Sequence, residues 1–397
     1  MSSTHTLDHV TSLLERHPLV DGHNDLPWLA RDEAGYDFDR LDIEAGTPGR
    51  SHTDIPRLRA GRLGGQFWSV FVPATLSQET AVTATLEQID AVHQMIGRYP
   101  DTFGLALTAQ DIEDVFASGR IASLLGAEGG HSIGCSLGTL RMLYVLGVRY
   151  MTLTHNDNVP WADSATDTPV HHGLSRFGVE VVREMNRIGM LVDLSHVSAD
   201  TMRDALRESV APVIFSHSSA RAVCDYPRNA PDDVLETLRD NNGVIMSTFV
   251  PDFVSPACAQ WRLDAADAAR EAGVSPTDLD AFKPFCATFA QEHPRPRATI
   301  DDVVAHFLHI REVIGIDHLG VGGDFDGVEN LPIGLEDVSG YPKVFAALAD
   351  HGWSDEDLIK VAGGNVIRVL RDAEAVAAEL QQTRGPSLMT MESVSED

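Results

Sequence analysis

The stretch Leu19-Val20-Asp21-Gly22-His23-Asn24-Asp25-Leu26-Pro27 decides how the rest of the chain is organised. Its apolar start is too short for a helix, and the proline at its end stops any regular continuation, so it is predicted to be a buried strand. His23 and Asp25 stand at the tip of this strand, and their spacing of two residues places both side chains on the same side of the chain. An imidazole and a carboxylate in such a position are typical metal ligands.

The same arrangement recurs along the sequence, because short apolar runs alternate with segments of helical periodicity. Eight runs are predicted to be strands, near residues 18–22, 67–72, 121–127, 149–154, 190–194, 212–215, 243–249 and 318–323. A further apolar run at 103–107 is expected to be an accessory strand or a loop. Regular alternation predicts parallel strands with right-handed crossovers, and eight repeats favour a closed (β/α)8 barrel of the TIM type over an open sheet.

The length of 397 residues fits one large barrel as well as two smaller domains, but no linker rich in Ser, Gly or Pro divides the chain. We therefore expect a single barrel domain over residues 1–380. An acidic, Ala-rich insertion at about 251–298, between the seventh and eighth predicted strands, is expected to be partly helical and to act as a lid or an oligomer contact. The polar, acidic tail at 381–397 is expected to be mobile.

Composition and charge exclude several classes of partner. With 43% hydrophobic and 22% charged residues, the chain has the composition of a soluble globular protein, and its net charge of −29 repels nucleic acids and anionic lipid surfaces. The sequence begins without the basic and apolar segments of a signal peptide, and no stretch is long and apolar enough to span a bilayer. The four cysteines lack CxxC spacing, so reduced thiols and a cytoplasmic location are expected.

Other imidazoles and carboxylates directly follow predicted strands. These residues are Glu128, His155, His196, His217 and Asp324. In a barrel, positions after the strands converge on the C-terminal mouth, where such folds carry their active sites. Any one of these side chains could be a satisfied core residue, but together with His23 they are difficult to explain in this way, because buried charge without a partner is costly.

Imidazoles and carboxylates without nearby cysteine thiolates suit divalent cations, and the number of candidate ligands favours two of them. None of the three lysines, at positions 283, 343 and 360, follows a predicted strand, so a lysine-derived bridge between the cations is not expected. Glu128 is the candidate bridge. His23 and Asp25 would complete one cation site, and His196 and His217 the other.

Eight motifs, in one order along the chain, resemble the membrane (renal) dipeptidase family, and the resemblance runs from about residue 18 to 375. They are DGHNDLP (21–27), GQFWSV (65–70), EGGH (128–131), LTHN (153–156), GLS (173–175), DLSHVS (193–198), SHS (216–218) and GGDFDG (322–327). The resemblance implies an amidohydrolase-like barrel and a binuclear zinc dipeptidase that is usually a homodimer, here of the bacterial soluble branch. Other divalent transition metals are possible.

The same resemblance implies roles for individual residues. His23, Asp25, Glu128, His196 and His217 would be the metal ligands, His155 and Arg228 would bind the substrate, and Asp324 would handle protons. The chemistry agrees, because two cations bridged by a carboxylate and a water would generate a hydroxide beside a polarised carbonyl. His155 is suited to the developing oxyanion, and the planar fork of Arg228 suits a substrate carboxylate. Hydrolysis of free dipeptides by a metal-bridging hydroxide is therefore expected.

Alternatives remain at this stage. A deaminase or lactonase on the same barrel would use a similar metal cluster, a metal-dependent binding protein would hold dipeptides without cleaving them, and a purely structural barrel would not need six ligand-type residues at its mouth. For Arg228 the alternative is a surface ion pair. His131 is expected to support the ligands rather than bind metal, and Asp326 is interpreted as a turn-former. Trp28 and Trp68 are interpreted as core residues, with a role in the wall of the pocket as the alternative.

Overall fold

The computed structural model describes residues 3–394, and its strands form one parallel sheet that closes on itself. The strands are β1 (Leu19–Asn24), β2 (Leu63–Ser69), β3 (Phe103–Leu105), β4 (Ile121–Glu128), β5 (Val148–Thr152), β6 (Leu191–Asp193), β7 (Ile214–Ser218), β8 (Val244–Ser247) and β9 (Leu319–Val321). Pairing of β2 with β4 closes a ring of eight strands and leaves β3 outside it, paired with β4. The predicted (β/α)8 barrel and its accessory strand are confirmed.

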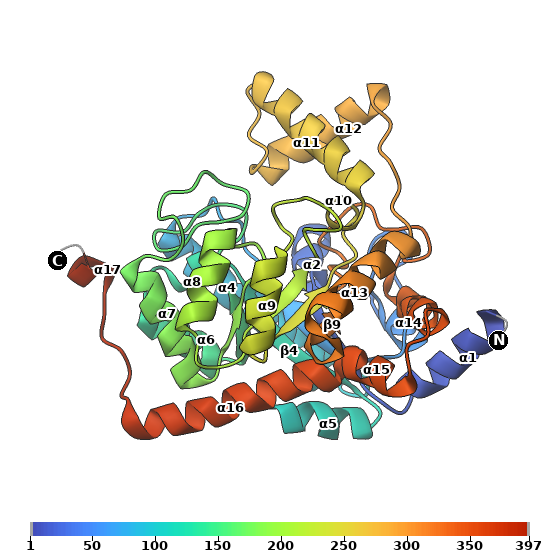
Figure 1. Cartoon of the computed structure of the whole chain (residues 1–397), viewed down its shortest axis with the longest axis horizontal. Helices are drawn as coiled ribbons and strands as arrows, with labels where there is room; N and C mark the ends of the chain where they lie inside the picture. The colour runs from blue at the N-terminus through green and yellow to red at the C-terminus, as the bar shows by residue number, and fades with distance from the viewer. Residues whose placement is uncertain (1–2, 395–397) are drawn as a thin grey trace.

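Helices connect the strands and cover the outside of the ring (Figure 1). They are α1 (Ser3–Leu14), α2 (Leu26–Ala34), α3 (Ile55–Ala60), α4 (Gln78–Arg98), α5 (Ala109–Ala117), α6 (Leu137–Val145), α7 (Arg176–Ile188), α8 (Ala199–Glu208), α9 (Asp232–Asp240), α13 (Ile300–Ile314), α14 (Tyr341–Asp350), α15 (Asp355–Ile359), α16 (Asn365–Thr383) and α17 (Met391–Val394). Ser175 and Ser198 accept hydrogen bonds from the first turns of α7 and α8, as N-cap residues do. These caps fix where the helices begin.

Alternate residues of the strands pack on opposite sides of the ring. Val20, Leu124 and Ile214 belong to one buried cluster, whereas their chain neighbours Leu19, Leu125 and Phe215 belong to the cluster that includes the outer helices. Close approach inside the ring requires glycine, because a Cβ on Gly322 would lie 1.9 Å from the carbonyl oxygen of Ser216. The interior is therefore a packed core rather than a channel.

The two ends of the barrel differ. Helices α16 and α5 run beneath one end, where Val366, Val369 and Leu370 join the interior cluster (Figure 1). The C-terminal ends of the strands open at the opposite end, from which the insertion projects. It consists of α10 (Pro251–Val254), α11 (Pro256–Glu271) and α12 (Leu279–Glu292). The predicted helical character of this insertion is confirmed.

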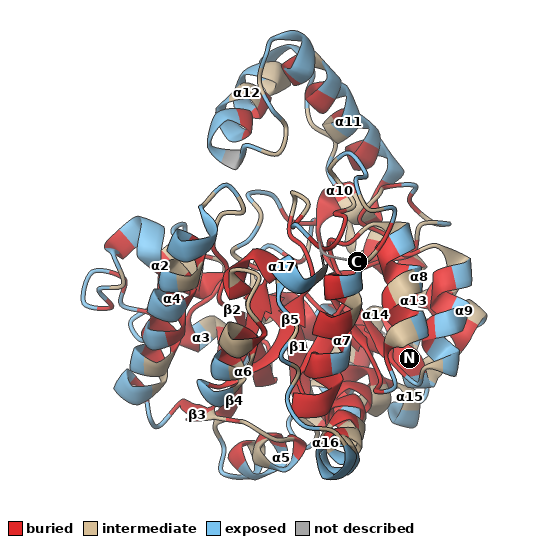
Figure 2. Ribbon diagram, turned by 90° about the vertical axis from the view of Figure 1, so that its left-hand side faces the viewer, coloured by how far each residue is buried: buried red, intermediate tan, exposed pale blue. Residues whose placement is uncertain are grey.

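Helices α11 and α12 form a hairpin that projects from the barrel, with much of its outer surface exposed (Figure 2). A separate buried cluster, which includes Trp261, Ala265 and Phe282, holds the two helices together. The hairpin is therefore a small packed unit attached to the barrel through α10.

The end of the described chain lies against α7. Helix α16 continues to Thr383, the Arg384 guanidinium pairs with Glu180, and the backbone N–H of Ser387 donates to Glu184 at 3.3 Å. Residues 395–397 of the predicted tail lie outside the described residues. None of the helices between residues 3 and 394 combines the length and the apolar character needed to cross a bilayer.

Candidate active site

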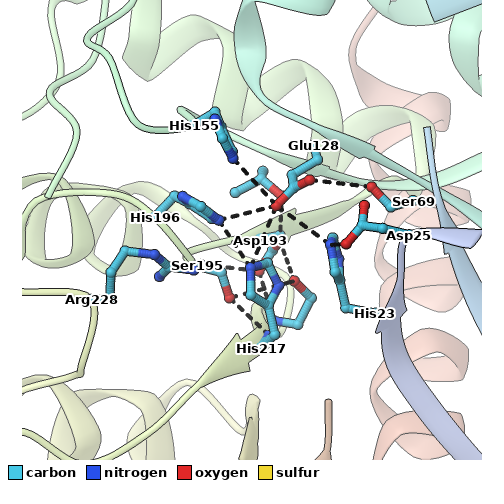
Figure 3. A network of polar contacts seen from close by, with 12 residues as sticks. His23, Asp25, Ser69, Glu128, His155, Asp193, Ser195, His196, His217 and Arg228 are labelled. Atoms are coloured by element: carbon cyan, nitrogen blue, oxygen red, sulfur yellow. Dashed lines mark hydrogen bonds and ion pairs between the residues drawn. The ribbon is translucent and has the colours of Figure 1, made fainter. Parts of the chain in front are cut away.

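The predicted ligand residues meet at the C-terminal mouth of the barrel (Figure 3). His23 is the last residue but one of β1, Glu128 is the last residue of β4, and His217 lies in β7. Asp25 directly follows β1, and His196 comes three residues after the end of β6. All five side chains are buried. Because the parallel strands end at the same rim, residues far apart in the sequence form one buried cluster.

The carboxylate of Glu128 lies at the centre of this cluster. Its Oε1 atom is 3.0 Å from Nε2 of His196 and 3.4 Å from Nε2 of His23. The Nε2 atoms of His217 and His155 lie 3.5 and 3.8 Å from the same oxygen. The other carboxylate oxygen, Oε2, accepts a hydrogen bond of 3.2 Å from Ser69. One oxygen thus faces four imidazoles, while the other is held by a hydroxyl.

Three overlapping groups of side chains have the spacing needed to hold a cation. They are His23 with Glu128 and His217, Glu128 with His155 and His196, and His23 with Asp25 and Asp324. The structure therefore also brings His155 and Asp324, for which substrate and proton roles are expected, within ligand distance of the other residues.

The polar atoms of the cluster fit divalent cations. Nε2 of His23 and Oδ1 of Asp25 are buried and have no hydrogen-bond partner among the described residues. Burial lowers the pKa of His155, His196 and His217 well below the usual value for imidazole, and nearby positive charge adds to the effect. These rings are neutral at pH 7, so their lone pairs are available to a metal.

Tyr150 orients His23. The Tyr150 hydroxyl lies 2.8 Å from Nδ1 of His23 and donates to the carbonyl oxygen of Gly22 at 3.1 Å. Because the hydroxyl proton is used in this way, Nδ1–H of His23 donates to Tyr150 and Nε2 is left free. A Cβ on Gly126 would lie 2.0 Å from the Tyr150 ring, so glycine is required for the ring to reach this position.

A second hydrogen-bonded chain orients His217. Nδ1 of His217 lies 2.9 Å from the Ser216 hydroxyl, which donates to Oδ2 of Asp193 at 2.6 Å. Thr152 donates to the same carboxylate oxygen at 2.5 Å. The ring therefore presents Nε2 to the cluster. Asp193 and Tyr150 were missed at the level of sequence, although a carboxylate within an apolar strand is a usable signal for such a support.

Arg228 is buried, so the alternative of a surface ion pair is wrong. Its exposed fraction is 2%, and Nε and Nη2 have no hydrogen-bond partner among the described residues. Nη1 has a long contact of 3.5 Å to Ser218, and the guanidinium lies 4.9 Å from the centre of the Phe253 ring. Burial lowers its pKa to about 10, so the side chain is charged at neutral pH. A buried cation with free donors suits an anionic group of a ligand.

Asp324 follows β9 through two glycines and has a φ of 60°, in the left-handed region. The backbone N–H before it, from Gly323, donates to Asp21 at 2.6 Å, which fixes the turn. Burial raises the pKa of Asp324 well above the usual range, and the carboxylates of Asp25 and Glu128 raise it further. A carboxyl group that holds a proton up to higher pH is suited to acid–base chemistry.

The remaining residues singled out from the sequence lie around the cluster. His131 contacts the carbonyl oxygen of Val72 through Nε2 at 2.8 Å and belongs to none of the cation groups above. Asp326 has a φ of 67°, as a turn residue, but its carboxylate also accepts from the backbone N–H of His52 at 2.5 Å. Trp68 is a core residue, and Trp28 lies against Phe71, whose ring lies 4.9 Å from that of His155.

A family model described as membrane dipeptidase (peptidase family M19) matches residues 7–384. The chain belongs to the membrane dipeptidase family. It is 42% identical over 388 residues to dipeptidase verJ of Clonostachys rogersoniana, covering 95% of this chain and 89% of that protein. It is also 43% identical over 385 residues to an uncharacterized dipeptidase of Schizosaccharomyces pombe, covering 93% and 84%.

The fold agrees with this assignment. A crystal structure of the probable dipeptidase PvdM from Pseudomonas aeruginosa superposes with a TM-score of 0.82 at 22% identity, covering 94% of this chain and all of that chain. As a member of the membrane dipeptidase family, the chain is a metal-dependent dipeptidase. The deaminase, lactonase, binding-protein and structural alternatives are thereby set aside.

Proposed function

We propose that this dipeptidase works with two divalent cations, zinc in the first place, bridged by Glu128. His23 and Asp25 would hold one cation, and His196 and His217 the other. The position of Glu128 supports its role as the shared ligand, because its Oε1 faces His23 at 3.4 Å and His196 at 3.0 Å. Nitrogen and carboxylate donors without thiolate are a usual set for catalytic zinc, with other divalent transition metals as alternatives.

The residues around the cations supply the rest of the chemistry. When bound, the cations polarise the scissile carbonyl and make an attacking water acidic enough to act near neutral pH. His155, neutral and buried at the edge of the cluster, donates a hydrogen bond to the carbonyl oxygen as negative charge develops on it. Asp324 accepts the proton of the water and delivers it to the departing amine.

Arg228 carries the proposal that the substrates are free dipeptides. Its guanidinium is 2% exposed and leaves Nε and Nη2 without a partner. Leaving buried charged donors unpaired is costly, and the carboxylate at the C-terminus of a dipeptide would satisfy them in a fork-like pair. The distance from this clamp to the cations would then select peptides of a fixed length.

The test compares free dipeptides with their C-terminal amides in metal-loaded protein. The wild type should cleave the free form in strong preference, and Arg228→Ala should lose most of that preference. Arg239→Ala is the matched control, because Arg239 is exposed on α9 and pairs with Asp240. Equal cleavage of free and amidated dipeptides by the wild type would rule out the clamp.

Location and assembly belong to the same proposal. The four cysteines are free thiols, and three of them are buried, which fits a reducing cytoplasmic compartment. A homodimer is the assembly that the family resemblance implies. Light scattering coupled to size-exclusion chromatography measures the mass directly, and a monomer of 43.1 kDa would exclude the dimer.

A further inference from the structure

The loop that carries Arg228, residues 219–230, is closed at its neck. Ala220 and Ala230 form a parallel bridge, in which the N–H of Ala230 donates to Ser219 at 2.8 Å and that of Arg221 donates to Ala230 at 2.9 Å. These hydrogen bonds hold the two ends of the loop together. The position of Arg228 therefore depends on what holds the neck and the tip of the loop.

Helix α10 holds the tip. The side-chain amide of Asn229 donates to the carbonyl oxygen of Cys224 at 2.8 Å and to that of Phe253 in α10 at 2.7 Å. The Phe253 ring lies 4.9 Å from the guanidinium of Arg228 and stacks on Tyr226 at 5.2 Å. Phe253 thus contacts Arg228 through its ring and Asn229 through its backbone carbonyl group.

His306, on α13, holds the neck. Its Nδ1 accepts from the backbone N–H of Ala220 at 3.1 Å, and its Nε2 lies 3.1 Å from the carbonyl oxygen of Val254, the last residue of α10. A neutral imidazole has one acceptor and one donor, and both are used here. His306 is completely buried. It therefore joins the Arg228 loop to α10 through two directed hydrogen bonds.

The same short helix is the base of the α11–α12 hairpin. Asp252 in α10 accepts two hydrogen bonds, of 2.8 and 2.9 Å, from Arg295 at the exit of the hairpin. At the other end of the hairpin, Thr277 lies near Asp157, which follows β5 on the rim of the barrel. The hairpin is thus anchored at α10, and its other end lies close to the rim.

We propose that His306 is a positioning residue for Arg228. It fixes the Arg228 loop to α10, so the helix that carries the hairpin also positions the carboxylate clamp. This inference rests on the proposed role of Arg228. The side-chain hydrogen bonds of His306 go to Ala220 and Val254 and to none of the proposed cation ligands, so it would act through the positions of these two residues. If α10 shifts, Phe253 and Arg228 shift with it.

Two substitutions at position 306 separate positioning from bulk packing. His306→Leu fills the space but leaves the Ala220 N–H and the Val254 carbonyl without partners, whereas His306→Gln supplies one acceptor and one donor. The measured quantity is the ratio of kcat/KM for a free dipeptide to kcat/KM for its amide. We expect His306→Leu to lower this ratio about tenfold or more, mainly through a higher KM for the free dipeptide, because small misplacements of binding groups are costly.

Controls keep the result specific. His306→Gln should keep the ratio within about twofold of the wild type, because both hydrogen bonds are preserved. His309→Leu, on the same helix, should not change it, since His309 pairs with Asp232 at 2.9 Å away from the loop. If His306→Leu does not fold, Phe253→Leu replaces it, because that substitution removes the ring beneath Arg228 from a partly exposed site.

The outcomes distinguish this inference from the proposed function. A wild type without preference for free dipeptides overturns the clamp and the positioning role together. A wild-type preference that Arg228→Ala abolishes, but that His306→Leu or its replacement Phe253→Leu retains in full, overturns the positioning role alone. A lowered ratio in His306→Leu, with recovery in His306→Gln and unchanged metal content in both, supports it.

Discussion

Oε1 of Glu128 lies 3.0 Å from Nε2 of His196, in a site where neither side chain is more than 8% exposed. Burial raises the pKa of the Glu128 carboxyl, and it lowers the pKa of His196 well below its usual value. Carboxylates and imidazoles that converge in a buried site are costly unless a cation or a proton joins them. This relationship is the physical basis for the proposal that metals bind beside Glu128.

Asp324→Asn should separate proton transfer from metal binding. The amide keeps the size of the side chain but cannot accept a proton, so we expect kcat to fall by about 10²–10⁴-fold while KM changes little. Turnover and metal content should be measured on the same preparation. A variant that has lost metal and recovers with excess zinc would show that Asp324 is first a ligand.

Tyr150→Phe should weaken metal binding, because it removes the acceptor that fixes Nδ1–H of His23. Losing a support of this kind typically costs about 10–100-fold in metal affinity. The affinity can be measured by competition with a chromogenic chelator. Tyr144→Phe is the control, since Tyr144 packs under Arg149 outside the site. Equal affinities in Tyr150→Phe and wild type would contradict the orienting role.

Stability should depend on pH through His306. Burial lowers its pKa from 6.5 to about 4, so between these values the unfolded chain binds a proton that the folded chain does not. Stability is therefore lost as the pH falls from 6.5 towards 4. From pH 7 to pH 5 the wild type should lose about 2 kcal/mol more than His306→Gln, which has no titrating group there. Urea unfolding at both pH values tests this, and parallel losses would exclude it.

The barrel could be predicted from sequence because a parallel strand covered on both faces is a continuous apolar run, and such runs recur regularly here. Strand bounds were less accurate. The predicted strand at 67–72 begins at Leu63 and ends at Ser69 in β2, because Gly64 and Gly65 have no side chain to show the pattern. His23, Glu128 and His217 lie within strands rather than after them.

The candidate site could be predicted as a set of ligand types after strands, but not as a network. Tyr150, Asp193 and His306 act through hydrogen bonds to distant partners, and no local pattern marks such partners. The partners are separated from them by 23 to 128 positions along the chain. Arg228 could be proposed as a carboxylate clamp from its chemistry, but its burial depends on Phe253 and the closed loop around it. Such long-range contacts can be recognised only in the three-dimensional structure.

The metal content of the wild type and of Glu128→Gln tests the bridge most directly. Both proteins are purified side by side, and elemental analysis is combined with an assay of dipeptide hydrolysis. If Glu128 joins the two cations, the wild type should hold close to two metals per chain and Glu128→Gln clearly fewer, with activity lost in parallel. His155→Ala should keep its metals, since His155 is assigned to the substrate. Close to two metals per chain in Glu128→Gln would contradict the bridging role of Glu128.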